Sequence, residues 1–154
     1  MSDLLFDKAK VAFVQGRLDE AIRAFGEMIA HDPANPVAYF SRGVARFNQH
    51  DLPGAIEDYS TSLRLAGGNE RVYCGRGAAY LAQGHLEDAL ADFNKAIELN
   101  EFHPTAYLGR AEILTRLGKH EQARLDVATA TEIQRRRGQS MLEGHGIVFQ
   151  DPGA

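Results

Sequence analysis

The sequence has little of what several protein classes require. Its 154 residues include one cysteine, Cys74, so no intrachain disulfide can form and a reducing compartment is expected. No segment approaches the roughly 18 consecutive apolar residues that a membrane-spanning helix needs, and the first residues lack the basic flank and apolar run of a signal peptide. The formal net charge of -4 is too small to indicate a nucleic-acid-binding protein. We therefore expect a cytoplasmic protein that binds neither membranes nor nucleic acid.

What the sequence does contain is an internal repeat of 34 residues. Four columns of small, aromatic or large apolar residues keep this spacing without insertions. The columns are Ala21, Ala55, Ala89 and Ala123; Phe25, Tyr59, Phe93 and Val127; Leu5, Tyr39, Tyr73 and Tyr107; and Ala9, Gly43, Gly77 and Ala111. Between the columns, apolar residues recur at helical spacing, and residues typical of turns separate the runs. The small column predicts close helix pairs, because a larger side chain there would overpack at a cost of about 1–3 kcal/mol.

The period and the columns resemble the tetratricopeptide repeat family, whose unit is a helix–turn–helix of 34 residues. The resemblance covers residues 2–137 in four units, 2–35, 36–69, 70–103 and 104–137, and it implies an all-α fold, a right-handed α-solenoid of four repeats. The residues predict helices at 3–15, 18–31, 36–49, 52–65, 70–83, 86–99, 104–117 and 120–136. The proline that closes the first unit, Pro33, has no equivalent in the other three units, and no unit contains tryptophan.

Residues 138–154 form the remaining C-terminal tail, which we expect to be partly extended or disordered. This tail lacks the long polar capping helix that the last repeat of a solenoid normally needs. Its apolar run Ile147-Val148-Phe149 lies between glycine and Pro152 and is expected to be extended.

Charged residues also follow the repeat. Arg42, Arg76 and Arg110 form one column, and each is followed 16 residues later by an aspartate, at Asp58, Asp92 and Asp126. We interpret the pairs as salt bridges between the two helices of a unit. A row of free arginines that bind phosphates is the alternative, but a paired guanidinium has fewer free donors.

No residue pattern indicates catalysis. The six histidines lie mostly at turns and helix ends, and no two have the spacing of a metal site on one helix. Cys74 has no base or orienting group near it in the sequence, as a nucleophile would need. We therefore expect no enzyme activity, no cofactor and no metal.

The resemblance implies that the first helix of each unit lines a concave groove. Matching by column, the peptide-binding residues would be Phe6, Lys10, Phe13, Phe40, Val44, Phe47, Arg71, Cys74, Leu81, Leu108, Glu112 and Arg116. Some family members hold the terminal carboxylate of chaperone tails with lysine, asparagine and arginine. The matching positions here hold Phe6, Lys10, Ser41, Arg71 and Gly75, which do not form such a clamp.

The groove residues predict a function in protein binding. Four phenylalanines in the first two units make an apolar surface, which typically marks a binding site for an amphipathic helix or an extended apolar segment. We therefore expect an adaptor or scaffold whose partner is another protein. An alternative for the rings is that they pack as ordinary core between units. A separate alternative for the function is a structural module that homo-oligomerises through its uncapped C-terminal end.

Overall fold

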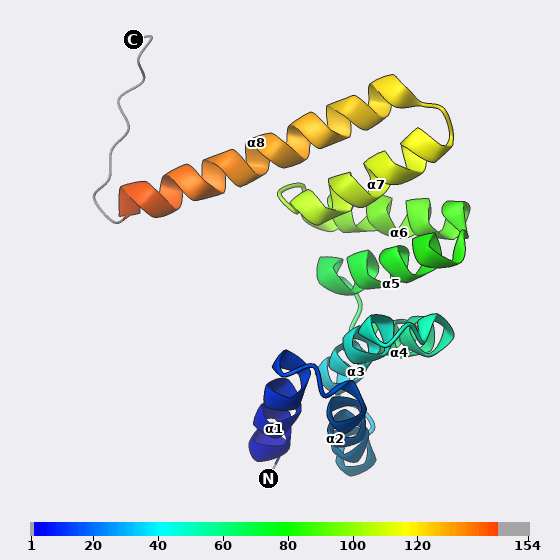
Figure 1. The fold of residues 1–154 in the computed structure, drawn as a ribbon, viewed down its shortest axis with the longest axis vertical. Coiled ribbons are helices and arrows are strands. Elements are labelled where there is room, and N and C mark those ends of the chain that lie inside the picture. The colour runs from blue at the N-terminus through cyan, green and yellow to red at the C-terminus, as the bar shows by residue number, and fades with distance from the viewer. Residues whose placement is uncertain (1, 145–154) are drawn as a thin grey trace.

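The computed structural model describes residues 2–144, and this part of the chain contains eight α-helices and no strand. The helices are α1 (Ser2–Val14), α2 (Leu18–His31), α3 (Pro36–Asn48), α4 (Leu52–Leu65), α5 (Glu70–Gln83), α6 (Leu86–Leu99), α7 (Pro104–Arg116) and α8 (His120–Gly144). Successive pairs form hairpins that stack from α1 at one end to α8 at the other (Figure 1). The prediction of an all-α solenoid is confirmed, and seven of the eight predicted helices agree with the structure to within one residue at each end.

Side-chain caps start the helices that begin the second and third units. The Asn35 side chain accepts hydrogen bonds from the backbone N–H groups of Val37 and Ala38 at 3.0 and 3.1 Å, and Pro36 occupies the first helical position. The Asn69 side chain likewise accepts from the Arg71 backbone N–H at 3.0 Å. These caps satisfy N–H groups that have no partner inside the helix, so each first helix begins at the same position in its unit.

The turn inside each hairpin uses a left-handed residue in the same column. Gly16, Gly84 and Gly118 have φ between 74 and 81°, and His50 has φ 65° at the equivalent position of the second unit. Glycine adopts this conformation without steric cost, whereas a residue with a Cβ atom does so at a cost of about 1–2 kcal/mol. Each hairpin turn therefore needs a residue with positive φ, and His50 adopts this conformation at an energetic cost that the three glycines do not have.

The stack is held together by aromatic rings that lie against glycines of the neighbouring helices. Tyr59 on α4 is 2% exposed and lies between Gly43 of its own unit and Gly75 of the next unit. Phe93 on α6, also 2% exposed, lies between Gly77 and Gly109 in the same way. A Cβ atom added at any of these four glycines would stand 3.3 Å or less from a ring carbon, so the missing side chains set the distance between helices.

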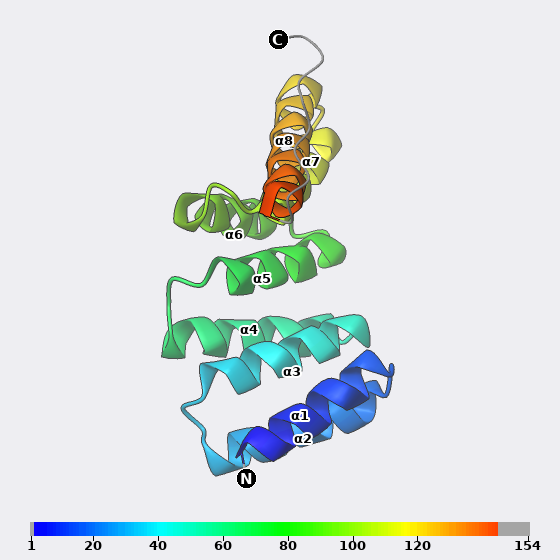
Figure 2. The same ribbon diagram turned by 90° about the vertical axis from the view of Figure 1, so that its left-hand side faces the viewer.

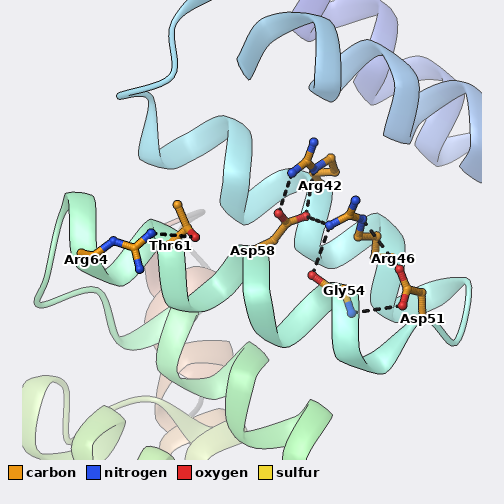
Figure 3. Close-up of polar contacts among 7 residues, drawn as sticks. All are labelled: Arg42, Arg46, Asp51, Gly54, Asp58, Thr61 and Arg64. Carbon is orange, nitrogen blue, oxygen red and sulfur yellow. Dashed lines mark hydrogen bonds and ion pairs between the residues drawn. The ribbon is translucent and has the colours of Figure 1, made fainter. Parts of the chain in front are cut away.

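The predicted salt bridges between the helices of a unit are confirmed. Arg42 donates to both carboxylate oxygens of Asp58 at 2.8 and 2.9 Å, and Arg46 donates to the same carboxylate at 3.0 Å. Figure 3 shows both arginines pointing towards this carboxylate. The equivalent pairs of the next two units, Arg76 with Asp92 and Arg110 with Asp126, have the same bidentate geometry.

These aspartates are 1–6% exposed, so their charges depend on the arginines for compensation. The pKa values of the arginines are raised above their ordinary value mainly by the hydrogen bonds to the aspartates. The arginines therefore stay charged and hold the hairpins together rather than offering a row of free phosphate-binding groups.

The last helix corrects the prediction for the C-terminal region. We expected a helix to residue 136 and no polar capping helix, but α8 continues to Gly144 without a break (Figure 1; Figure 2 views this helix nearly end-on). Glu132 accepts from Arg135 at 2.9 Å and from Arg136 at 2.6 Å, one turn further along, which supports the helix where we expected it to end. Gly138 lowers helix stability by only about 1 kcal/mol and does not terminate the helix. Residues 145–154, with the run predicted to be extended, lie outside the described residues.

Candidate binding groove

A hollow of about 290 Å³ lies where the first helices of the first three units meet. It is lined by Lys10, Phe13 and Val14 of α1, Phe25 of α2, Phe40, Ser41 and Val44 of α3, and Arg71 of α5. Five of these eight residues are among the predicted peptide-binding residues, Lys10, Phe13, Phe40, Val44 and Arg71, and a sixth, Ser41, was expected in the groove at a position that matches the family's carboxylate clamp. The stacking of α1, α3 and α5 therefore brings together residues that are up to 61 positions apart in the sequence.

Two aromatic residues of this hollow, Phe13 and Phe40, are partly buried and held in position by the core. Phe40 packs against the cluster formed by Ala55, Tyr59, Val72 and Ala79, with its ring centroid 6.0 Å from that of Tyr59. Phe13 packs in the same manner against the first core cluster, which includes Phe25. One side of each ring belongs to the core and the other faces the hollow. The fixed rings form an apolar surface that needs no reordering before a ligand binds.

Two exposed cations lie at opposite sides of this apolar surface. The Lys10 ammonium lies 5.4 Å from the centroid of the Phe6 ring, and the Arg71 guanidinium lies 5.9 Å from the centroid of the Phe40 ring. Cations over aromatic faces are attracted by the ring quadrupole and keep their charge available to solvent. The hollow therefore combines an apolar floor with positive charge on both sides.

A second hollow, of about 420 Å³, adjoins the first one. It shares Phe40 and Arg71 with it and extends over Pro36, Val37 and the loop 66–69 between α4 and α5. Val37 is 52% exposed, which continues the apolar surface. Together the two hollows, which we call the groove, run from α1 across α3 to the start of α5.

Not every predicted residue lines the groove. Cys74 and Leu81 are 6% and 8% exposed and pack in the core cluster around Phe93, because α5 turns this face towards α6 and α7. They are core residues rather than part of an open surface, which corrects the prediction for these two positions. Burial raises the pKa of the Cys74 thiol to about 12, so the thiol is neutral and unreactive at physiological pH.

The remaining predicted residues lie near the groove or further along the stack. Phe6 and Phe47 are half-buried against the core and do not line either hollow. Leu108, Glu112 and Arg116 lie exposed on α7, and Glu112 pairs with Arg116 at 2.5 Å. None of these three residues of α7 lines either hollow, and the groove as defined above lies on the first three units.

The sequence prediction missed Val14 and Phe25 as lining residues. Val14 is 84% exposed, and Phe25 contributes to the hollow from the second helix of its unit. The repeat assigns second helices to the outer layer, so only the packing of Phe25 against α1 and α3 reveals its position in the hollow.

The chemistry of the groove is that of binding. Among the described residues, no group of three or more histidine, cysteine or acidic side chains could hold a metal ion. None of the helices in the described part of the chain is long and apolar enough to cross a membrane. An apolar floor with cationic sides can bind an apolar segment that carries acidic groups.

Comparisons with known proteins agree with the repeat architecture. Models of the tetratricopeptide repeat match residues 6–70, 70–103 and 104–124. No curated protein matches the chain.

Among solved structures, the first tetratricopeptide repeat domain of Spaghetti (RPAP3) bound to the HSP90 peptide SRMEEVD is 30% identical, with TM-score 0.74 over 76% of this chain and 93% of that one. The first such domain of human RPAP3 is also 30% identical, with TM-score 0.73 over 79% of this chain and 95% of that one. A crystal structure of MamA has TM-score 0.81 at 20% identity over 89% of this chain and 80% of that chain, a likeness of fold alone.

Proposed function

Because this chain belongs to the tetratricopeptide repeat family, we propose that it is an adaptor or scaffold that holds an apolar peptide or amphipathic helix of another protein in the groove. The observation that carries this proposal is the hollow in which Phe13, Phe40 and Val44 are held by the core and left open on one side. Binding through the family fold is supported by the related RPAP3 domain, which is bound to a peptide.

The two cations indicate the chemistry of the ligand. Lys10 and Arg71 lie on either side of the apolar floor, so a fitting segment has an apolar side chain with acidic residues before and after it. We do not propose a clamp for a terminal carboxylate, because Phe6, Ser41 and Gly75 occupy three of the five matching positions. The acidic residues would therefore lie within the ligand segment rather than at its end.

Selection from a library of short peptides tests the proposal. We expect the wild-type chain to select peptides with an apolar residue flanked by Asp or Glu. The double variant Lys10→Glu, Arg71→Glu should lose most of the affinity for a selected peptide, measured by fluorescence anisotropy. The variant Arg116→Glu changes another exposed arginine, outside the groove, and should bind as the wild type does.

The double variant is preferable to truncation of the phenylalanines, which would open cavities in the core. Selection of peptides without acidic residues, or unchanged affinity in the double variant, would contradict the proposed groove chemistry. Circular dichroism of both variants should match that of the wild type, because all three substituted side chains are exposed.

Self-association through the C-terminal end is a second candidate function. It is favoured by the apolar side chains that α8 leaves exposed, with Leu125 68%, Val127 45% and Met141 68% exposed. Light scattering on a chain ending at Gly144 checks whether residues 145–154 are needed, because α8 is retained in full. An adaptor should keep its ligand in this shortened form, whereas an assembly that depends on these residues should change its size.

A cytoplasmic location is also part of the proposal, and it is based on the single cysteine of the sequence.

A further inference from the structure

A hollow of about 750 Å³ lies outside the groove, along α8 at the end of the stack opposite to α1 (Figure 1). Its floor is one side of α8, where Leu125, Ile133, Arg137 and Ser140 lie at spacings of eight, four and three residues. This side extends over about 22 Å. Phe102, in the loop that joins α6 to α7, also lines the hollow and is 57% exposed. The described residues therefore leave an apolar surface open, and such a surface typically marks an interaction site.

The chain leaves α8 on the side of this hollow. Gly144, the last residue of α8, follows Arg137 by seven residues and Ile133 by eleven. These spacings are close to whole numbers of helical turns, so all three residues lie on one side of the helix. Ser140 lies about 6 Å before Gly144 along the helix axis. The residues that follow α8 therefore start beside the hollow, whereas the groove lies on the first three units.

The sequence that follows α8 carries groups that fit this surface. Ile147-Val148-Phe149 is an apolar run, and Asp151 follows it by two residues. Gly144 and Gly146 precede the run, and glycine lacks the Cβ atom that restricts a sharp reversal of the backbone. Successive side chains of an extended segment point to opposite sides, so Ile147, Phe149 and Asp151 would share one side. That side offers two large apolar groups and then a carboxylate.

The segment is long enough to return along α8. The five residues from Gly144 to Phe149 span up to about 17 Å, whereas Arg137 lies only about 10 Å before Gly144 along the helix axis. The Arg137 side chain donates to the backbone carbonyl oxygen of Phe102, so Phe102 lies beside this part of α8. Phe149 can therefore reach Phe102, and the remaining length allows for the turn.

Two arginines give this part of the hollow a positive charge. Arg136 pairs at 2.6 Å with Glu132, a carboxylate that also accepts from a second arginine. Arg137 has no carboxylate at ion-pair distance among the described residues. Glu101 also lines the hollow, without an ion pair to either arginine in that part of the chain. A segment with a carboxylate beside its apolar side chains complements this arrangement.

We propose that residues 147–151 fold back onto α8 of their own chain and cover this part of the hollow, with Phe149 against Phe102 and Asp151 beside the two arginines. An extended segment of this length covers about 13 Å, close to the roughly 10 Å of α8 between residues 133 and 140. A segment tethered so closely has an effective concentration on the order of millimolar, which favours its own hollow over that of a second copy.

The proposed cover acts independently of the groove. Ligand binding in the groove neither requires it nor is required by it. It does limit the second candidate function, because a docked segment prevents this part of the hollow from taking part in self-association.

The test uses fluorescence, because the chain contains no tryptophan. Phe149→Trp in the full-length chain places a single fluorophore at the proposed contact. Its emission should lie at shorter wavelength than that of a peptide of residues 144–154 with the same substitution, and acrylamide should quench it less. Both differences should be independent of protein concentration, since the contact lies within one chain.

Further substitutions in the Phe149→Trp chain identify the surface that is covered. Phe102→Asp should return emission and quenching to the values of the peptide, and Asp151→Lys should raise quenching. Val127→Asp is the matched control, because it changes a 45% exposed residue of α8 outside the hollow and should have no effect. The groove variant Lys10→Glu, Arg71→Glu should also have none. Circular dichroism verifies that every variant remains helical.

A reciprocal reporter covers the case in which tryptophan is too large at position 149. Phe102→Trp places the fluorophore on the hollow and leaves the segment unchanged. Its emission should move to longer wavelength when Phe149→Asp is added, because the cover is then released from the hollow.

Three outcomes would overturn the proposal, each in a different way. Emission of Phe149→Trp equal to that of the peptide, with Phe102→Trp insensitive to Phe149→Asp, shows that the segment does not dock. Protection that the groove variant abolishes and Phe102→Asp does not shows that the segment occupies the groove. Protection that appears only as the concentration rises, together with a mass above 16.9 kDa in sedimentation velocity, shows that it docks on a second copy.

Discussion

Substitution of Gly109 by alanine tests how the repeats are held together. Gly109 lies inside α7, where the ring of Phe93 from the previous unit lies against its backbone. A Cβ atom at this position would overlap the end of that ring, with Cε2 at 2.7 Å. Phe93 has little room to retreat, because its ring also lies so close to the backbone of Gly77 that an added Cβ atom there would stand 3.3 Å from it.

The magnitude follows from two opposing effects. Alanine gains about 1 kcal/mol over glycine in a helix interior, and overpacking a core costs about 1–3 kcal/mol. Gly26 on α2 is the matched control, because the nearest atom to its Cβ position is a flexible side-chain nitrogen at 3.8 Å. Gly26→Ala should therefore stabilise the chain, and Gly109→Ala should be less stable than Gly26→Ala by about 1–3 kcal/mol.

Thermal and urea unfolding followed by circular dichroism measures the difference. At this chain length each kcal/mol shifts Tm by about 2–4 °C, so the two variants should differ by roughly 2–12 °C. Shortening the ring with Phe93→Leu should recover part of the loss in the Gly109→Ala background. Equal stability of Gly26→Ala and Gly109→Ala would refute the idea that contact between ring and glycine sets the distance between units.

Three further predictions concern the turns, the ion pairs and the buried thiol. His50→Gly should raise the unfolding free energy by up to about 1 kcal/mol, because it removes the cost of a left-handed residue with a Cβ atom; unchanged urea midpoints would contradict this. Asp92→Ala should lower the free energy of unfolding by about 2–3 kcal/mol. This is less than the loss expected for a fully buried ion pair, because 21% of the Arg76 side chain is exposed. The control Asp88→Ala, at an exposed neighbouring position, should leave stability nearly unchanged. Cys74 should react with a thiol reagent far more slowly in native than in urea-unfolded protein. Because burial raises its pKa from 9.0 to about 12, the unfolded state ionises first and stability should fall as pH rises from about 9 towards 12, a loss that Cys74→Ala should remove.

The candidate groove could be predicted only in part from the sequence. The repeat pattern indicated Phe13, Phe40 and Arg71, which the structure places in one hollow. It also indicated Cys74 and Leu81, which are buried. The same column of a repeat can face solvent in one unit and core in another, because exposure depends on the side chains contributed by the neighbouring unit.

The C-terminal region shows a second reason why the structure differs from what the sequence predicted. The last helix was expected to end at residue 136, yet α8 continues to Gly144. The hydrogen bonds from Arg135 and Arg136 to Glu132 support the helix locally, and the apolar side of α8 packs on α7. The composition of the segment shows neither of these contacts directly.

By itself the sequence determined the number of repeats, the position of seven of the eight helices and the pairing of arginines with aspartates. These features follow from helical spacing, turn residues and a fixed repeat length, all of which are local properties of the chain. Only the tertiary structure decided which aromatic rings belong to the core, where the groove ends and that α8 leaves an open apolar hollow beside it. Those features depend on how far each side chain is covered by helices that are distant in the sequence, which no local pattern specifies.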